Sequence, residues 1–305
     1  MKIYTPKDFP LPFETVITIG SFDGIHLAHK ALFEETKKLA HLLNVKPVVV
    51  SFDPHPRMVL FPESNLKLLT TLEEKLYLLS LLEIENLVLI PFTKTLSELS
   101  HDLFVQEYIV DKIKAKGIIV GFNFRFGKFR KGDVDYLNKV AKKYNFIVKA
   151  IPPVMLNGVI ISSSAIRNLI EKGNIESANE LLGRPYLIMG KVIKGKGRGK
   201  EIGYPTANLE VSPLKLLPPP GVYAVWVILN KEKLKGALNI GKKPTFGEKE
   251  ISIEVHIFNF NKNIYGETLK IELIKRIRDE KKFPSIEELK NRIEKDCKLI
   301  DEILH

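Results

Sequence analysis

The sequence predicts an α/β protein with an N-terminal doubly wound parallel sheet, followed by a small antiparallel β-barrel domain and a terminal helix. From residue 14 to about 151, short apolar runs alternate with amphipathic stretches, which is the βαβ pattern of a parallel sheet. From residue 186 to 275, short alternating runs are separated by Gly, Pro and Asn, which is typical of a barrel. The pattern changes at Gly183-Arg184-Pro185, and we therefore expect two domains, residues 1–183 and 184–305.

The parallel sheet is expected to contain five strands with helices between them. The strand candidates are Val16 to Gly20, Pro47 to Phe52, Leu87 to Pro91, Ile118 to Gly121 and Phe146 to Ile151. The helix candidates lie near 29–43, 72–82, 101–115, 133–144 and 175–182. A terminal helix begins at Ser285, because Ser285 and Glu288 have the spacing of a capping box.

Composition indicates a globular protein of the cytoplasm. Hydrophobic residues make up 45% and charged residues 27% of the 305 positions. No apolar run approaches the length of a membrane span, and the N-terminus lacks a signal-peptide core, so we expect no membrane association. The single Cys297 excludes an internal disulfide and favours a reducing compartment. Cys297 falls in an apolar helical stripe and is expected in the core.

The formal net charge of +11 suits anionic ligands and equally suits RNA. An RNA-binding barrel would interleave aromatic and basic residues on an exposed sheet. The basic stretch from Lys191 to Lys200 contains no aromatic residue, so we expect no nucleic acid partner. Only nine of the 47 basic residues are arginines, which indicates positions where a planar guanidinium matters.

The stretch from Thr18 to His29 joins a predicted strand to a predicted helix. The β-branched residues before it suit a buried strand, and Gly20 and Gly24 permit a tight turn. A helix N-terminus offers free N–H groups to an anion, and His26 and His29 would add donors for a phosphate. The alternative is an ordinary strand, turn and helix, in which a histidine caps the helix or lies at the surface.

Three more polar clusters accompany the predicted parallel sheet. Ser51 to Arg57 and Gly121 to Gly127 follow predicted strands, at the edge where such sheets bind ligands. In the third cluster, Ser163 and Ser164 precede Arg167 by four and three residues, so hydroxyls, N–H groups and a guanidinium could converge on one phosphate. Serines at this position can also serve only as helix caps.

The predicted barrel carries its own candidate site. A basic, glycine-rich loop contains Gly195, Lys196, Gly197 and Arg198, and it is either a phosphate-binding loop or a solvated flexible one. Thr206 and Asn208 lie two residues apart on a strand, so they face one side and offer neutral oxygen ligands to magnesium. Glu254, between Ile253 and Val255, is either solvated or a functional base.

The pattern Gly-x-Phe-Asp-Gly-x-His-x-x-His at Gly20 to His29 resembles the signature of the HxGH nucleotidyltransferases, with Ala28 where Gly is usual. Ala is the smallest replacement, so close approach of a substrate should survive. Nearly the whole chain is similar to the bacterial bifunctional riboflavin kinase/FAD synthetase family. The matching segments are Gly20 to His29, Pro54-His55-Pro56, Gly121 to Gly127, Ile161 to Arg167, Gly203 to Asn208, Pro220 to Tyr223, Asn239 to Gly241, Glu254 and Tyr265-Gly266.

The resemblance implies a bifunctional transferase whose partners are ATP, riboflavin, FMN and FAD, with flavins as substrate and product. The C-terminal domain would phosphorylate riboflavin to FMN with Mg²⁺ and ATP, and the N-terminal domain would adenylylate FMN to FAD with release of pyrophosphate. A stand-alone pantetheine-phosphate or nicotinate-mononucleotide adenylyltransferase would leave residues 184–305 unexplained. We expect a monomer or a weak homo-oligomer.

The resemblance also assigns residues. The catalytic residues would be His26, His29, Arg167 and Glu254. In the N-terminal domain, ATP would be bound by Gly20, Phe22, Asp23, Gly24, Ser163 and Ser164, and FMN by Pro54, His55, Asn123 and Arg125. In the C-terminal domain, ATP would be bound by Gly195, Lys196, Gly197, Arg198, Thr206 and Asn208, the last two also holding magnesium.

Overall fold

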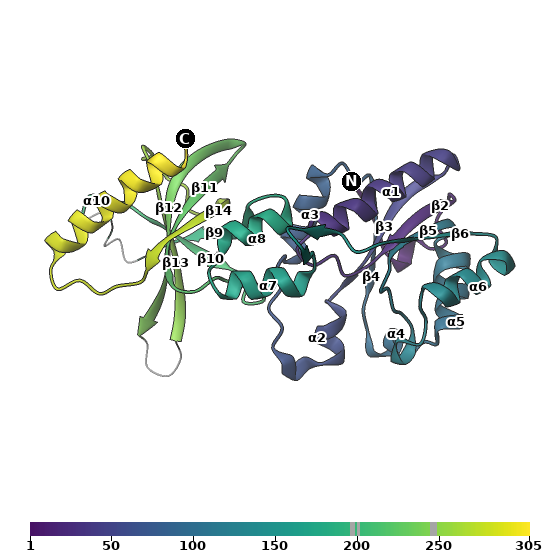
Figure 1. The fold of residues 1–305 in the computed structure, drawn as a ribbon. Helices are drawn as coiled ribbons and strands as arrows, with labels where there is room; N and C mark the ends of the chain where they lie inside the picture. The colour runs from purple at the N-terminus through teal and green to yellow at the C-terminus, as the bar shows by residue number, and fades with distance from the viewer. Residues whose placement is uncertain (196–198, 200–201, 245–248) are drawn as a thin grey trace. The chain divides into compact units, whose positions relative to one another are not determined.

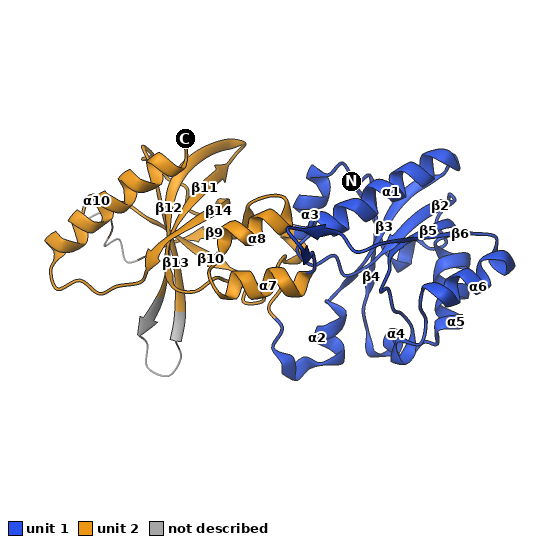
Figure 2. Ribbon diagram, viewed as in Figure 1, with its two compact units in different colours: residues 1–66, 75–162 blue, residues 67–74, 163–305 orange. Residues whose placement is uncertain are grey.

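The computed structural model describes residues 1–195, 199, 202–244 and 249–305, which form two compact units (Figure 2). Residues 1–66 and 75–162 make up the sheet unit, and residues 67–74 and 163–305 make up the barrel unit. The short segment 67–74 therefore packs with the barrel although the chain on both sides of it belongs to the sheet. The predicted domains, 1–183 and 184–305, follow motifs rather than packing, and they stay a prediction.

The sheet unit contains six parallel strands in the order β1-β4-β3-β2-β5-β6 (Figure 1). The strands are β1 (Lys2–Tyr4), β2 (Thr15–Ile19), β3 (Lys46–Asp53), β4 (Asn86–Pro91), β5 (Ala115–Gly121) and β6 (Ile147–Ile151). All five residues of β2 are buried, as expected for a central strand of a parallel sheet. The predicted doubly wound sheet is confirmed. The three-residue β1 is too short for its periodicity to be seen in the sequence.

Helices connect these strands, and α1 (Leu27–Leu42) contacts β2, β3 and β5. The others are α2 (Pro56–Leu60), α3 (Leu72–Leu81), α4 (Lys94–Ser97), α5 (His101–Leu103) and α6 (Val134–Tyr144), with short 3-10 turns η1 (Pro6–Asp8), η2 (Pro62–Ser64) and η4 (Lys128–Arg130). The helix predicted near 101–115 is α5 followed by a π-helical segment, η3 (Phe104–Lys112). A two-stranded hairpin, β7 (Met155–Leu156) and β8 (Val159–Ile160), completes the unit.

The order in which the strands are added changes side at the middle of the sheet. From β2 the sheet continues through β3 and β4 on one side and through β5 and β6 on the other. The edge beyond the carboxyl ends of β2 and β5 is therefore a topological switch point, where doubly wound sheets bind ligands. The turn after β2 contains the Gly20 to His29 motif, which the fold thus places at this edge.

The barrel unit contains a closed antiparallel barrel in the order β10-β13-β12-β11-β14-β9. Its strands are β9 (Tyr186–Ile193), β10 (Ala207–Val211), β11 (Gly221–Leu229), β12 (Glu232–Pro244), β13 (Lys249–Ile257) and β14 (Thr268–Asp279). Helices α7 (Ser163–Glu171) and α8 (Ile175–Leu182) precede it, and α10 (Ile286–Ile303) follows it. The Ser285 hydroxyl accepts a hydrogen bond from the Glu288 N–H at 3.2 Å, which confirms the predicted start of α10.

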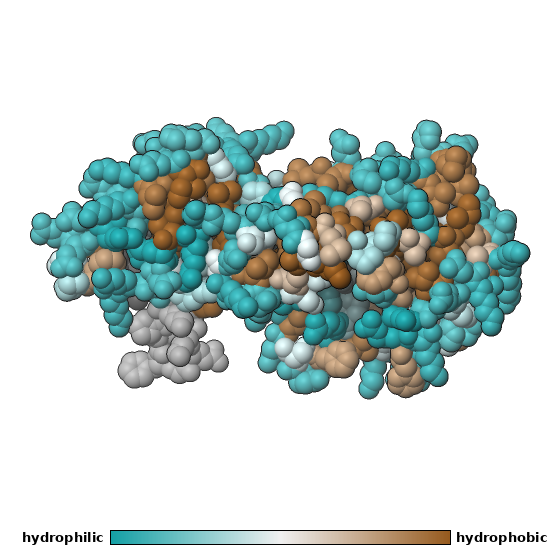
Figure 3. Space-filling view, viewed as in Figure 1, coloured by the Kyte–Doolittle hydropathy of each residue, from teal (hydrophilic) through white to brown (hydrophobic). Residues whose placement is uncertain are grey.

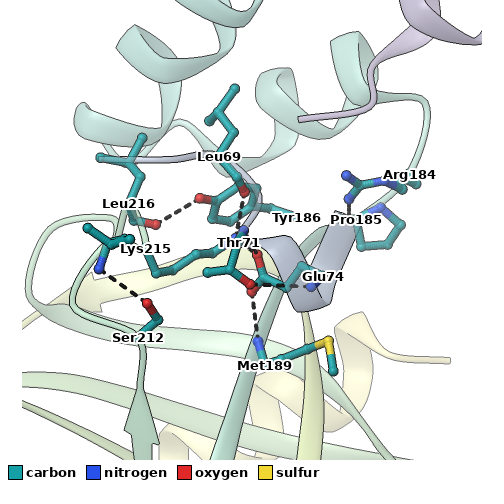
Figure 4. A network of polar contacts seen from close by, with 11 residues as sticks. Leu69, Thr71, Glu74, Arg184, Pro185, Tyr186, Met189, Ser212, Lys215 and Leu216 are labelled. Carbon is teal, nitrogen blue, oxygen red and sulfur yellow. Dashed lines mark hydrogen bonds and ion pairs between the residues drawn. The ribbon is translucent and has the colours of Figure 1, made fainter. Parts of the chain in front are cut away.

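Segment 67–74 is held in the barrel unit by a buried ion pair (Figure 4). Lys215 Nζ lies 2.7 Å from Glu74 Oε2, and both side chains are completely buried. The same ammonium donates to the Leu69 carbonyl at 2.6 Å and lies 4.2 Å from the centre of the Tyr186 ring. Backbone hydrogen bonds join Leu68 to the chain around Lys215 as well. The sequence did not predict this attachment.

Candidate active sites

The turn between β2 and α1 has a constrained backbone. Phe22 and Ile25 have φ values of 48° and 43°, in the left-handed region that residues with side chains rarely adopt. Phe22 is 1% exposed, and a Cβ on Gly20 would lie 3.0 Å from its ring, so a side chain at position 20 would press against it. The buried ring therefore favours glycine at this position. The constrained backbone of the turn fixes the position at which α1 starts.

Two histidines lie at the start of α1. His26 directly precedes the helix and His29 is in its first turn, and their rings stack with centres 3.6 Å apart. Burial holds the pKa of His29 well below its usual value, and the nearby His26 and Lys75 charges lower the pKa further. His29 is therefore neutral at pH 7. Its buried Nδ1 has no hydrogen-bond partner among the described residues, which leaves this nitrogen for a ligand.

The other predicted residues of the sheet unit follow β3 and β5, the two strands beside β2. Pro54 and His55 follow β3, and His55 Nδ1 accepts a hydrogen bond from the Arg57 N–H at 3.1 Å. Asn123 and Arg125 follow β5 and are exposed. Arg125 forms an ion pair with Asp133, the residue that caps α6. Flavin binding by Arg125 would therefore have to share or replace this ion pair.

The predicted serine and arginine cluster belongs to the barrel unit. Ser163 and Ser164 are the first two residues of α7, and Arg167 lies one turn later. Arg167 Nε donates a hydrogen bond to the Lys67 carbonyl at 3.3 Å, within the same unit. The joint action of these residues with His26 and His29 on one phosphate stays a prediction.

A second set of polar residues meets on the barrel around Glu254. In the antiparallel register, Glu254 of β13 is paired with Asn208 of β10 and with Asn239 of β12. Paired residues face the same side of a sheet, so two amides flank the carboxylate. The Thr206 hydroxyl donates to Glu254 Oε2 at 3.4 Å. Glu254 is half-buried, so its carboxylate is neither in the core nor fully solvated.

The glycine-rich loop begins beside this cluster. A Cβ on Gly195 would lie 2.0 Å from the Asn208 amide nitrogen, so any other residue here would push the Asn208 side chain out of its place. The predicted phosphate-binding residues Lys196, Gly197 and Arg198 lie outside the described residues. Gly195, which directly precedes them, lies against the side chain of Asn208.

A cavity of about 530 Å³ opens next to Glu254. It has the size of a small-molecule site. Its apolar wall is formed by Val222, Ala237, Leu238, Phe283, Ile286, Leu289 and Ile293. Thr206, Asn239, Glu254 and His256 are among the polar residues that line it. In the space-filling view, hydrophobic side chains lie over the barrel strands beside α10 and are surrounded by hydrophilic ones (Figure 3).

The prediction that Cys297 lies in the core is wrong. Cys297 is only partly buried and lines the cavity together with Ile286, Leu289 and Ile293. The later part of the same stripe, Ile300 and Leu304, packs in the core against Val222 and Ala224. The first part of the apolar stripe of α10 thus lines the cavity and the last part packs in the core. Periodicity alone could not distinguish the two parts.

Four further charged residues line the cavity, namely Arg278, Glu280, Lys281 and Asp296, and no motif in the sequence points to them. Asp296 is 4% exposed and is held between two arginines, at 2.7 Å from Arg278 Nε and 2.9 Å from Arg292 Nε. Arg278 and Asp296 both line the cavity. Sequence spacing indicates only the pair within α10, because Arg278 comes from β14.

No group of three His, Cys, Asp or Glu side chains suited to a metal ion occurs within the part of the chain that the structure describes. Thr206 and Asn208 offer a hydroxyl and an amide oxygen beside the Glu254 carboxylate. Magnesium commonly takes one or two protein ligands and completes its shell with phosphate oxygens and water. The donor set on the barrel therefore fits a magnesium ion that arrives with a nucleotide.

The parallel sheet and the barrel define a transferase with two domains of different activity. A family model described as FAD synthetase matches residues 10–165, and one described as riboflavin kinase matches residues 182–304. Proteins named bifunctional riboflavin kinase/FMN adenylyltransferase are similar over most of the chain. The one from Bacillus subtilis is 39% identical, covering 93% of this chain and 90% of its own, and the one from Haemophilus influenzae is 36% identical, covering 92% and 91%. The chain belongs to this bifunctional family.

A solved structure matches the chain along its whole length. It is titled as a macrolide-efflux protein from Streptococcus pneumoniae, is 34% identical, covers 99% of both chains and has a TM-score of 0.90. The macrolide efflux named in this title refers to the Streptococcus pneumoniae protein. Within the described residues, the structure has no helix that combines the length and apolar character needed to cross a membrane.

Proposed function

We propose that the barrel unit transfers the γ-phosphate of ATP to riboflavin and that the resulting FMN is adenylylated to FAD at the Gly20 to His29 motif. The observation that carries this proposal is the position of Glu254. Its carboxylate lies at the wall of an apolar cavity that suits a flavin ring, beside Thr206 and Asn208. A base, an apolar pocket and neutral oxygen ligands are the parts that a kinase for an apolar alcohol requires.

In the first reaction, the Glu254 carboxylate accepts the proton of the riboflavin 5′-hydroxyl while that oxygen attacks the γ-phosphorus of ATP, and ADP leaves. General-base catalysis of this kind contributes about 10²–10⁴-fold to a rate. Thr206 and Asn208 would hold a magnesium ion, which neutralises phosphate charge when bound. Gly195 would let the loop backbone approach the phosphates.

In the second reaction, a phosphate oxygen of FMN attacks the α-phosphorus of ATP, and pyrophosphate leaves. The attacking phosphate is already ionised, so no general base is needed. The motif contributes position and charge stabilisation: the N–H groups at the start of α1, His26 and neutral His29 donate to phosphate oxygens. We assign ATP binding also to Gly20, Phe22, Asp23 and Gly24, and to Ser163, Ser164 and Arg167. Flavin binding is assigned to Pro54, His55, Asn123 and Arg125.

The setting of the reactions is inferred from composition. A single cysteine favours the reducing cytoplasm, and the excess positive charge suits two anionic nucleotides. We propose ATP, riboflavin, FMN and FAD as the ligands, no nucleic acid partner, and a monomer or weak homo-oligomer.

Two substitutions separate the reactions. His29→Ala should suppress FAD formation and leave FMN formation intact, because it alters only the motif. Glu254→Gln should suppress FMN formation from riboflavin but leave FAD formation from added FMN intact. Chromatography of products after incubation with ATP, Mg²⁺ and riboflavin or FMN measures both.

Matched controls are His41→Ala and Glu210→Gln, which change an exposed histidine of α1 and an exposed glutamate of β10. Both controls should keep both activities. Loss of both activities from either His29→Ala or Glu254→Gln would refute the assignment of two separate sites.

A further inference from the structure

Lys75 is a buried lysine behind the Gly20 to His29 motif. It lies in the part of α3 that belongs to the sheet unit, and it is 6% exposed. Its Nζ donates a hydrogen bond to the Ser21 carbonyl at 2.8 Å and lies 3.4 Å from the Ser51 hydroxyl. A lysine is almost never buried unless its ammonium group is paired. The burial of Lys75 therefore indicates a specific role for its ammonium group.

The charge of Lys75 is balanced by two carboxylates of the same unit. Burial lowers the pKa of Lys75, while Asp23 and Asp53 act in the opposite direction. Asp23 belongs to the motif and is 2% exposed, and Asp53 is the last residue of β3. The ammonium group therefore lies among residues that surround the predicted ATP site.

The hydrogen bond to Ser21 fixes the motif at its most constrained point. Ser21 directly precedes Phe22, which has a positive φ, and Gly24 has a φ of 91° two residues later. Such a backbone persists only where its surroundings hold it in place. The Lys75 ammonium holds the carbonyl from one side, and the Ser51 hydroxyl donates to the same oxygen at 3.4 Å.

Lys75 also acts on His29. The positive charge of Lys75 is one of the causes that lower the pKa of His29, after burial and His26. A neutral His29 keeps a lone pair on one ring nitrogen and an N–H on the other. The lysine thus contributes to both the shape and the charge state of the motif.

We propose that Lys75 is a positioning residue for FMN adenylylation, whose ammonium group fixes the Ser21 carbonyl and thereby the backbone that carries His26 and His29. The inference rests on the proposed function of the motif. Lys75 touches the turn and not the reacting atoms. Misplacement of a site by about 1 Å can lower a rate about a hundredfold, so the effect belongs in kcat more than in KM.

The test is Lys75→Met in the full chain, which keeps most of the side-chain volume and removes the charge and the donor. We expect kcat for FAD formation from FMN to fall about tenfold to a hundredfold. Riboflavin phosphorylation by the same protein, which occurs in the other unit, should stay within about twofold and thereby report that the chain is folded. Lys75→Gln, with a neutral amide in the same space, provides a second variant.

The pH dependence of FAD formation distinguishes this role from simple packing. The charged groups around His29 are His26 on the same segment and Lys75 from α3, with Asp23 and Asp53 facing the lysine. Removing the lysine charge raises the pKa of His29, so the acid limb of kcat should move to higher pH. A lysine that only fills space would lower the rate equally at every pH.

Lys142→Met serves as the control, because Lys142 is an exposed lysine of α6 in the same unit. It should change neither activity. The proposal fails if FAD formation by both Lys75 variants stays within twofold of the wild type, if the acid limb does not move, or if both activities fall together. A wild-type protein that makes no FAD would instead refute the proposed function of the motif.

Discussion

Removal of either partner of the Glu74–Lys215 ion pair should strongly destabilise the barrel unit. The 2.7 Å pair is completely buried, so neither charge can be compensated by water. Within the described part of the chain, Lys215→Met leaves the Glu74 carboxylate with hydrogen bonds from the Thr71 and Met189 N–H groups, at 3.0 and 2.9 Å, and with the electrostatic attraction of Arg184. An uncompensated buried charge destabilises a protein by about 3–5 kcal/mol.

This free energy converts into a measurable change in melting temperature. A domain of about 150 residues shifts its Tm by about 2–4 °C for each kcal/mol. The barrel unit has about this size, so Lys215→Met should lower its Tm by roughly 6–20 °C. The double variant Glu74→Gln/Lys215→Met removes both charges and should be more stable than Lys215→Met alone, with a coupling energy of about 2 kcal/mol.

Tryptophan fluorescence gives an assay that is specific for this unit. Trp226 is the single tryptophan of the chain and lies on β11. The matched control is Lys298→Met, because Lys298 and Glu294 are also 2.7 Å apart but exposed on α10. Such an exposed pair is screened by water and contributes little to stability. If Lys215→Met melts within 2 °C of Lys298→Met, or the double variant is no more stable than Lys215→Met, the reasoning on the buried charge is wrong.

Three further predictions concern the two sites. Arg167→Lys should lower FAD formation about tenfold or more while FMN formation is kept, because lysine lacks the planar fork; near-normal FAD synthesis would show that the fork is not used. Gly195→Ala should raise the KM for ATP in riboflavin phosphorylation, since its Cβ would lie 2.0 Å from the Asn208 amide, and unchanged constants would contradict this. Burial, and after it Asp296, raises the pKa of the Cys297 thiol to about 11. Its alkylation by iodoacetamide should therefore be slow at pH 8, rise about tenfold per pH unit up to about pH 10 and be slowed by riboflavin; a plateau near pH 8.5 or no protection would exclude this environment.

The fold could be predicted to a large extent because its signals are local. The apolar runs of the parallel strands are continuous, and the capping residue of α10 stands directly before the helix. The sequence could not predict β1, whose three residues show no period, or the π-helical segment η3, which has an ordinary helical pattern. Both depend on packing against neighbours that are distant in the sequence.

Parts of the candidate sites could likewise be predicted from the sequence, and other parts could not. The Gly20 to His29 motif and the Thr206, Asn208 and Glu254 set could be found because each residue type is unusual for a strand end or a strand interior. The cavity next to Glu254 could not be found, because α10 forms one wall of it with residues typical of a core. Cys297 was misplaced for this reason: periodicity shows that a helix face is covered, but not whether side chains or a cavity lie against it.

The start of α3 shows why burial has to be known before charge can be interpreted. Thr71 and Glu74 form a capping box, with the Glu74 N–H donating to Thr71 Oγ1 at 3.3 Å, so the sequence Thr-Leu-Glu-Glu-Lys is explained locally. The same Glu74 carboxylate pairs with Lys215, 141 residues later in the chain, within the barrel unit. The next residue, Lys75, is buried in the sheet unit against the Ser21 carbonyl. The adjacent residues Glu74 and Lys75 at the start of α3 thus bind partners in two different units. The capping box explains their place in the sequence but shows neither of these contacts. The role of a charged residue such as Glu74 or Lys75 therefore becomes clear only when the burial of its side chain and its hydrogen-bond or ion-pair partners are known.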